Sequence, residues 1–122
     1  MKVLLVDDQE DIRKIGRLSL ESVGKLQTLV AASAAEALQL ARSERPDLIL
    51  MDVMMPGMDG LAALAELRRI PELSAIPVMF MTAKVQGSEV ERYLRAGAVG
   101  VINKPFDPMT LPSEIRRILL RR

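Results

Sequence analysis

Short apolar runs alternate with longer amphipathic stretches five times along the chain. The apolar runs cover residues 2–6, 26–31, 48–52, 77–82 and 99–103, which are lengths typical of strands buried in a parallel sheet. Helices are predicted between and after them, over residues 9–23, 34–45, 61–69, 88–97 and in the segment after residue 107. Repeated strand–helix units with right-handed crossovers predict an α/β fold, a doubly wound parallel sheet of five strands between two layers of helices.

Capping residues indicate where several of these helices begin and end. Gly24 is placed to end the first helix as a left-handed cap. Ser33 and Ser88, each with a glutamate three residues later, have the spacing of a capping box. Pro112 lies one turn into the segment predicted as the last helix, so we expect a distortion there.

Composition narrows the chemistry that this chain can carry out. The chain has no cysteine and no histidine, which excludes disulfides, thiolate catalysis, Cys- or His-based metal sites and histidine bases. Carboxylates, hydroxyls and amines remain, and their natural metal partners are hard cations such as Mg²⁺. The net charge of +1 gives no electrostatic reason to expect binding to nucleic acid or to an anionic membrane.

Length and hydropathy predict one domain outside the membrane. With 122 residues, 49% of them hydrophobic, residues 1–122 are expected to form a single globular domain. The longest apolar runs are well short of the roughly 20 residues that a membrane span needs. Asp7 and Asp8 interrupt the first run before a signal sequence could develop, so we expect a cytoplasmic protein.

Acidic residues stand at the ends of two predicted strands. Asp7 and Asp8 follow the first strand and Asp52 closes the third. Because the carboxyl ends of parallel strands meet at one edge of a sheet, we expect the three acids to lie together, with the strand order 2-1-3-4-5 of a flavodoxin-like three-layer sandwich. Two carboxylates about 4 Å apart repel by roughly 4 kcal/mol at an effective dielectric constant of about 20, so the group needs a counter-charge. A simpler interpretation is that the acids only cap the adjacent helix and loop.

A hydroxyl and an ammonium group are expected at the same edge. Thr82 ends the fourth predicted strand and Lys104 ends the fifth. Carboxylates, a metal ion, a hydroxyl and an ammonium group together suit phosphoryl transfer, because a carboxylate can attack an activated phosphoryl donor while the other groups stabilise the transferring oxygens. Alone, a strand threonine is commonly a β-former and a lysine is commonly solvated, so their joint position is what favours this chemistry.

The motifs around these residues resemble the receiver domains of two-component response regulators, including the single-domain chemotaxis type. They occur in the family's order and span essentially the whole chain. The matching segments are Val6-Asp7-Asp8, Leu50-Met51-Asp52, Met55-Pro56-Gly57-Met58-Asp59-Gly60, Thr82-Ala83 and Lys104-Pro105-Phe106. Each motif alone is weakly specific, but the ordered set is highly specific.

The resemblance implies a phosphoacceptor, a metal site and partners. Asp52 would be the phosphoacceptor, and Asp7 and Asp8, with Asp52 and the backbone carbonyl of Met54, would hold Mg²⁺ or Mn²⁺. The phosphoryl group would come from a histidine kinase or a histidine phosphotransfer protein. A downstream protein or a homodimer would read the response through the face formed by the fourth helix, the fifth strand and the fifth helix.

The phosphoryl-binding residues match the family, but the position of its switch aromatic does not. The resemblance implies that Thr82 and Lys104 bind the phosphoryl group and that the Lys104–Pro105 peptide bond is cis. Val101 stands where an aromatic side chain usually turns inward as the threonine engages phosphate. Since valine offers no such rotamer change, we expect any signal to pass through Thr82, residues 83–87 and the fourth helix. For the single tyrosine, Tyr93 in that helix, we expect a packing role, with an exposed position as the alternative.

Two positions in the family tune how readily water attacks the acyl phosphate. Here they are Met54 and Lys84, and neither offers an obvious group to orient water, so we expect slow loss of phosphate. Two alternative functions are left open, a pseudo-receiver that only binds partners and an aspartate-nucleophile phosphatase. The phosphatase needs a second acid where this chain has Met54. We therefore expect a signalling module and not an enzyme, apart from self-catalysed phosphoryl transfer and slow autodephosphorylation.

Overall fold

Five strands form one parallel sheet in the computed structural model, which describes residues 1–83 and 86–121. The strands are β1 (Lys2–Val6), β2 (Gln27–Ala31), β3 (Leu48–Asp52), β4 (Val78–Thr82) and β5 (Gly100–Asn103), in the order β2-β1-β3-β4-β5. β3 pairs with β1 on one side and with β4 on the other. The predicted order is therefore confirmed, including the neighbouring strands one and three on which the acidic site depends.

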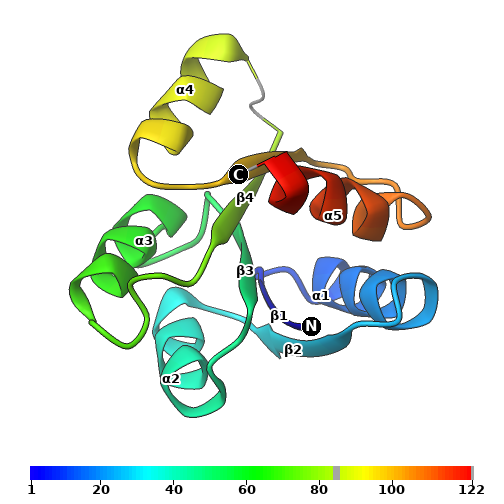
Figure 1. Cartoon of the computed structure of the whole chain (residues 1–122), viewed down its shortest axis with the longest axis horizontal. Helices are drawn as coiled ribbons and strands as arrows, with labels where there is room; N and C mark the ends of the chain where they lie inside the picture. The colour runs from blue at the N-terminus through cyan, green and yellow to red at the C-terminus, as the bar shows by residue number, and fades with distance from the viewer. Residues whose placement is uncertain (84–85, 122) are drawn as a thin grey trace.

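Helices cover both faces of this sheet, as Figure 1 shows. On one face lie α1 (Glu10–Leu18), which continues into a π-helical turn, η1 (Ser19–Val23), and α5 (Leu111–Arg121). On the other face lie α2 (Ala34–Glu44), α3 (Gly60–Arg69) and α4 (Gly87–Arg95). The predicted doubly wound three-layer sandwich is thus confirmed. In the described ranges, none of the helices has the length and apolar character needed to span a membrane.

The sheet forms the core because its central strands are apolar on both faces. Every residue of β3 and β4 is buried. Met51 and Phe80 belong to the cluster that packs against α2, α3 and α4, whereas Leu50 and Met79 belong to the cluster that packs against η1 and α5. The buried strands hold the acidic and hydroxyl residues at their carboxyl ends in fixed positions.

One predicted helix cap is confirmed and one is wrong. The Ser33 hydroxyl accepts a hydrogen bond of 3.2 Å from the N–H of Glu36 and so caps α2. Ser88 lies inside α4, because this helix begins one residue earlier, at Gly87. Its N-cap residue is Gln86, whose side chain makes no capping hydrogen bond.

The end of the first helix also differs from the prediction, for a steric reason. Gly24 has a φ of −83° and is not left-handed, whereas the next residue, Lys25, has a φ of +57°. A Cβ on Gly24 would lie 2.8 Å from the Cβ of Pro112, so this glycine permits close packing against α5. The distortion expected at Pro112 is also wrong: α5 runs without a break from Leu111, and a proline in the first turn of a helix costs no hydrogen bond.

Candidate functional site

Four strands deliver polar side chains to one edge of the sheet. Asp7 directly follows β1, and Lys104 directly follows β5. Asp52 and Thr82 are the last residues of β3 and β4. Above the buried Asp7 is a cleft of about 480 Å³, which is lined by Asp8, Gln9, Ile12, Asp52, Met54, Thr82, Ala83, Lys104 and Pro105. The structure therefore brings together the residues predicted to hold a metal ion and a phosphoryl group.

Three carboxylates face one another at this cleft. Asp7, Asp8 and Asp52 each offer one oxygen, and these oxygens all lie within 4.8 Å of one another. Asp7 and Asp52 are 0% and 5% exposed, whereas Asp8 is exposed. Carboxylate oxygens that are open to water on one side suit a hard divalent cation that retains part of its hydration shell. The residues present therefore fit Mg²⁺ or Mn²⁺.

Lys104 supplies a counter-charge to the buried acids. Its Nζ lies 2.8 Å from Oδ2 of Asp7 and 3.5 Å from Oδ1 of Asp52. Burial by itself lowers the pKa of Lys104, but the hydrogen bond to Asp7 and the charges of both aspartates raise that pKa above its usual value. The side chain is therefore a cation at neutral pH and lies between the two carboxylates.

The charge of Asp52 is only partly compensated. Burial, followed by the charge of Asp7, raises the pKa of Asp52 above its usual value, while Lys104 and the backbone N–H of Met54 act in the opposite direction. Because the net effect is a rise, ionised Asp52 is less stable in this site than in water. A bound cation would relieve this penalty, which agrees with the fit of the acidic group to a divalent ion.

Hydrogen bonds hold the first acidic loop in place. The N–H of Asp7 donates to the carbonyl of Ala31 at 3.1 Å, and Oδ1 of Asp7 accepts from the N–H of Gln9 at 2.9 Å. The carbonyl of Asp7 accepts from Nη1 of Arg13 at 2.8 Å. The sequence prediction did not include Arg13. The sequence contains one indication of this role: Arg13 lies one helical turn after Gln9, and from there its long side chain can reach back to the loop.

A glycine lets α3 begin against Asp52. A Cβ on Gly60 would lie 2.6 Å from the carbonyl oxygen of Asp52 and 3.0 Å from Cε1 of Phe80. Asp59, directly before it, is the N-cap of α3. This role of Gly60 also went unpredicted, although a glycine directly after a helix-capping aspartate is a visible signal of close backbone approach.

The remaining predicted positions lie around the cleft or apart from it. The Lys104–Pro105 peptide bond is cis, the form that the resemblance implies. Met54 is 66% exposed and lines the cleft. Lys84 lies outside the described residues. Val101 does not line the cleft but packs, from β5, against the cluster that contains Phe80.

Comparisons with known proteins agree with this arrangement. The sequence model of a family described as the response regulator receiver domain matches residues 3–116. The chain is 34% identical over 123 residues to response regulator Rre1 of Synechocystis sp., covering 100% of this chain and 53% of that protein. It is 38% identical over 119 residues to the transcriptional regulatory protein CseB of Streptomyces coelicolor, covering 98% of this chain and 49% of that protein. The chain thus spans about half the length of these curated relatives.

A solved structure extends the similarity to nearly a whole protein. The chemotaxis response regulator CheY4 of Vibrio cholerae superposes with a TM-score of 0.88 at 32% sequence identity. The match covers 96% of this chain and 97% of that one. The sheet and helices described above are therefore shared along almost their full length.

Proposed function

The chain belongs to the receiver domain family of two-component response regulators, and on this premise we propose that Asp52 accepts a phosphoryl group with the help of a divalent cation. One observation carries the proposal. The Asp52 carboxylate lies within 4.8 Å of two other carboxylates and 3.5 Å from the Nζ of Lys104. A receiver domain is a signalling module and not a metabolic enzyme, so the consequence of the chemistry is a shift between two conformers.

The chemistry of the transfer follows from the groups at the cleft. An oxygen of the Asp52 carboxylate attacks the phosphorus of a phosphohistidine, the P–N bond breaks, and an acyl phosphate forms as the imidazole leaves. Lys104, already beside Asp52, pairs with one phosphoryl oxygen. The hydroxyl of Thr82, at the end of the neighbouring strand, donates to another.

A divalent cation has a defined place in this scheme. Asp7, Asp8 and Asp52, with the backbone carbonyl of Met54, would hold Mg²⁺ or Mn²⁺. When bound, the ion neutralises negative charge on the phosphoryl oxygens. Phosphorylation replaces the single charge of the Asp52 carboxylate with about two negative charges on the phosphoryl group, in a site that holds two further carboxylates and one ammonium group, so a divalent cation would offset most of the excess negative charge.

Intact mass spectrometry tests the assignment of Asp52. Incubation of the wild-type chain with acetyl phosphate and Mg²⁺ should give a single phosphoryl adduct, and Asp52→Asn should give none. Asp59→Asn is a matched control from the same loop, because Asp59 is exposed and asparagine still caps a helix. A wild-type chain without an adduct, or Asp52→Asn with an undiminished one, refutes the assignment.

Exposed apolar side chains on α1 and in the segment before α5 suit the docking of the phosphoryl donor. Ile15 and Leu18 on α1 are 42% and 63% exposed, and Met109 in the segment before α5 is 69% exposed. This segment lies against the end of α1, where the Ser19 hydroxyl donates to the carbonyl of Pro108. We expect a histidine kinase or phosphotransfer protein to cover this surface. If Ile15→Glu accepted phosphate from a phosphohistidine protein at the wild-type rate, this docking site would be wrong.

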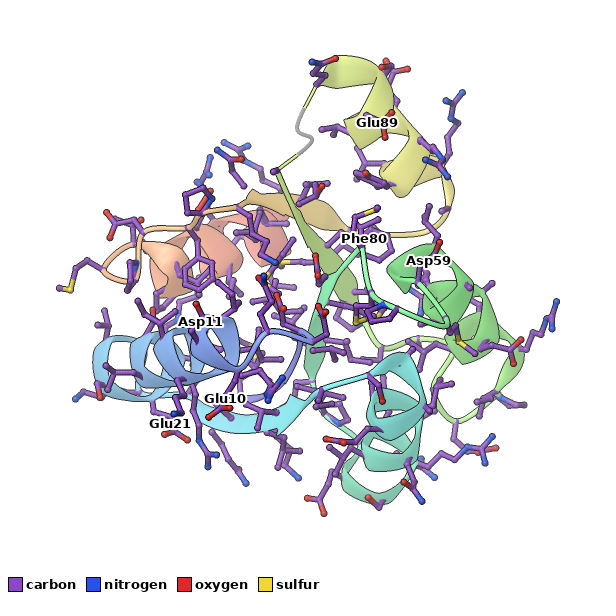
Figure 2. The ribbon with its side chains drawn as sticks, turned by 180° about the vertical axis from the view of Figure 1, so that it is seen from behind. Glu10, Asp11, Glu21, Asp59, Phe80 and Glu89 are labelled. Atoms are coloured by element: carbon purple, nitrogen blue, oxygen red, sulfur yellow. The ribbon has the colours of Figure 1, made fainter. Side chains whose placement is uncertain are left out.

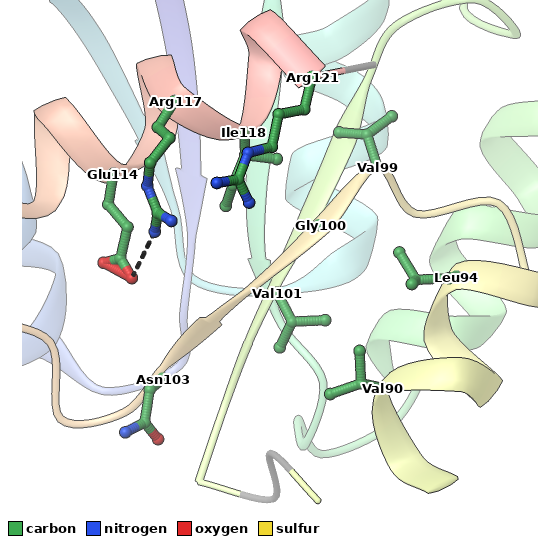
Figure 3. Close-up of a pocket in the computed structure, with 10 residues that line it drawn as sticks. All are labelled: Val90, Leu94, Val99, Gly100, Val101, Asn103, Glu114, Arg117, Ile118 and Arg121. Atoms are coloured by element: carbon green, nitrogen blue, oxygen red, sulfur yellow. Dashed lines mark ion pairs between the residues drawn. The ribbon is translucent and has the colours of Figure 1, made fainter. Parts of the chain in front are cut away.

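A groove between α4, β5 and α5 suits the output partner. It has a volume of about 440 Å³, and Arg117 and Arg121 of α5 extend beside it. Figure 3 shows its apolar lining, formed by Val90, Leu94, Val99, Val101 and Ile118. A downstream protein, or the same face of a second copy, would bind here with apolar side chains against the valines and with carboxylates next to the two arginines. Analytical ultracentrifugation before and after phosphorylation distinguishes a second copy from a downstream protein. If the phosphorylated chain stays monomeric, the partner is a different protein.

The two alternative functions have less support. A module that only binds partners needs neither the acidic group nor the ion pair between Lys104 and the buried Asp7. A phosphatase would carry a second acid two residues after its nucleophile, and this position is Met54, an exposed thioether.

A further inference from the structure

Helix α4 packs on the rest of the molecule with one buried side chain. Of its nine residues, all within the described ranges, Tyr93 alone is buried, at 2% exposure. In Figure 1 this helix lies at the edge of the molecule, next to β4 and β5. Its amino end has no side-chain cap. Among the residues of α4, Tyr93 is therefore the one most completely packed against the rest of the molecule.

Tyr93 contacts the strand that ends in Thr82. Its ring packs edge-on against Phe80 of β4, with the ring centroids 5.5 Å apart and an interplanar angle of 67°. Figure 2 shows Phe80 between the sheet and α4, the helix that carries Glu89. Because aromatic pairs prefer this T-shaped geometry, the contact fixes the orientation of the helix as well as its distance from the sheet.

Phe80 also reaches the backbone beside the proposed phosphoacceptor. Its Cε1 lies 3.0 Å from where a Cβ on Gly60 would be, and the same Cβ would lie 2.6 Å from the carbonyl oxygen of Asp52. Gly60 therefore lies close to both the carbonyl of Asp52 and the ring of Phe80, and this ring in turn packs against Tyr93. Across β4 and β5, Phe80 pairs with Val101, the position where the family usually has its switch aromatic. Since Val101 has no ring, Phe80 makes its aromatic contact with Tyr93 of α4 instead.

The carboxyl end of α4 is fixed by other contacts. After the helix, the N–H of Ala98 donates to the carbonyl of Tyr93 at 3.1 Å. Arg68 of α3 donates to the carbonyl of Gly97 at 3.3 Å and to that of Ile76 at 3.0 Å. This end of α4 is thus tied to α3, and a tilt of the helix about it would move the Tyr93 ring against Phe80.

The ring of Tyr93, and not its hydroxyl, makes the contact with the sheet. The hydroxyl donates to Oε2 of Glu89 at 3.3 Å, and Arg92 approaches the same carboxylate oxygen at 3.7 Å. All three residues belong to α4, so these interactions hold the side chain within its own helix. Removing the hydroxyl should therefore leave the anchor in place, whereas removing the ring should release it.

We propose that Tyr93 is the positioning residue that sets where α4 lies, and that phosphorylation of Asp52 is transmitted to α4 through the contact between Phe80 and Tyr93. The trigger in this inference rests on the proposed function of Asp52. The anchoring of α4 by Tyr93 does not, and it is tested separately.

Hydrogen–deuterium exchange of three variants tests the anchor. Tyr93→Leu removes the ring, Tyr93→Phe keeps it, and Leu94→Ala is a matched control at the next residue, which is 44% exposed. Tyr93→Leu should speed exchange in residues 87–95 by about tenfold and leave β1 and β3 unchanged, while the other two variants stay within about twofold of wild type. Exchange in Tyr93→Leu that is no faster than in Leu94→Ala overturns the anchor, as does equal acceleration in Tyr93→Phe.

The transmission can be followed in the unmodified chain. With one tyrosine and no tryptophan, its intrinsic emission belongs to Tyr93 alone. Adding acetyl phosphate and Mg²⁺ should change this emission, and the exchange of residues 87–95, in proportion to the adduct seen by intact mass. An adduct without a change at Tyr93, or a Tyr93→Leu variant with the full wild-type response in α4, overturns the transmission. Without any adduct, the proposed function and the transmission both fail, and the exchange experiment still decides on the anchor.

Discussion

Replacing Lys104 with methionine tests the charge balance of the site. Methionine keeps most of the apolar stem but removes the ammonium group that lies 2.8 Å from Asp7 and 3.5 Å from Asp52. Asp7 and Asp52 are 0% and 5% exposed, so water compensates only in part for the lost cation. We therefore expect Lys104→Met to lose stability in the absence of divalent ions.

The size of the loss follows from distance and burial. Two carboxylates whose oxygens lie within 4.8 Å of each other repel by roughly 3.5 kcal/mol or more at an effective dielectric constant of about 20. Removing one partner of a buried ion pair costs about 3–5 kcal/mol, because the other charge stays buried. The free energy of unfolding of Lys104→Met should therefore be lower by about 3–5 kcal/mol, a large share of the roughly 5–15 kcal/mol typical of a domain.

Urea unfolding in a chelating buffer measures this loss. Circular dichroism is the suitable signal because the chain has no tryptophan. Lys2→Met is the matched control, since its ion pair with Glu44, at 3.3 Å, is exposed and should contribute about 1 kcal/mol or less. A loss in Lys104→Met no larger than in Lys2→Met would refute the reasoning. Added Mg²⁺ should then restore more stability to Lys104→Met than it adds to wild type, because the ion replaces the missing cation.

Three further predictions concern residues around this charge. Asp52→Asn should raise the free energy of unfolding in a chelator. The pKa of Asp52 is raised from 3.8 in the folded protein, so wild type should lose stability relative to the variant as the pH rises from about 3.8 through the folded pKa. Urea unfolding measures this, and the same difference in the free energy of unfolding between wild type and variant on both sides of that pH window contradicts the prediction. Gly60→Ala should cost about 1–3 kcal/mol, because its Cβ meets the carbonyl of Asp52, whereas Gly87→Ala, with no atom within 4 Å of its Cβ, should be neutral or stabilising in the same assay. Thr82→Ala should still form the phosphoryl adduct but lose the change in amide exchange of residues 87–95, and an unchanged response argues against a role for Thr82 in the switch.

The fold and the position of the site could be predicted because both depend on local signals. β3 and β4 are buried on both faces, so their residues form apolar runs that read as strands without knowledge of their partners. Parallel pairing then places the ends of all strands at one edge. For this reason Asp52, Thr82 and Lys104 could be placed together from the sequence alone.

Contacts between distant residues could not be predicted in this way. At the end of the first helix Lys25 is the left-handed residue, while Gly24 packs on Pro112 of a helix far along the chain. The hydrogen bond from Arg13 to the carbonyl of Asp7 depends on the exact path of a loop. The sequence favours a packing role for Tyr93, but that it is the one buried residue of α4 depends on Phe80 in a different element.

The position of Lys104 also constrains how ion binding and phosphorylation are linked. Its Nζ lies 2.8 Å from Asp7 and 3.5 Å from Asp52, so in the proposed mechanism a phosphoryl group on Asp52 competes with Asp7 for the same ammonium group. Asp7 is fully buried and needs another cation as Lys104 moves away, which the divalent ion would provide. The ion and the phosphoryl group should therefore raise each other's affinity by the same factor, as linkage requires. Equal Mg²⁺ affinities of the chain with and without a stable phosphoryl analogue on Asp52 would refute this linkage.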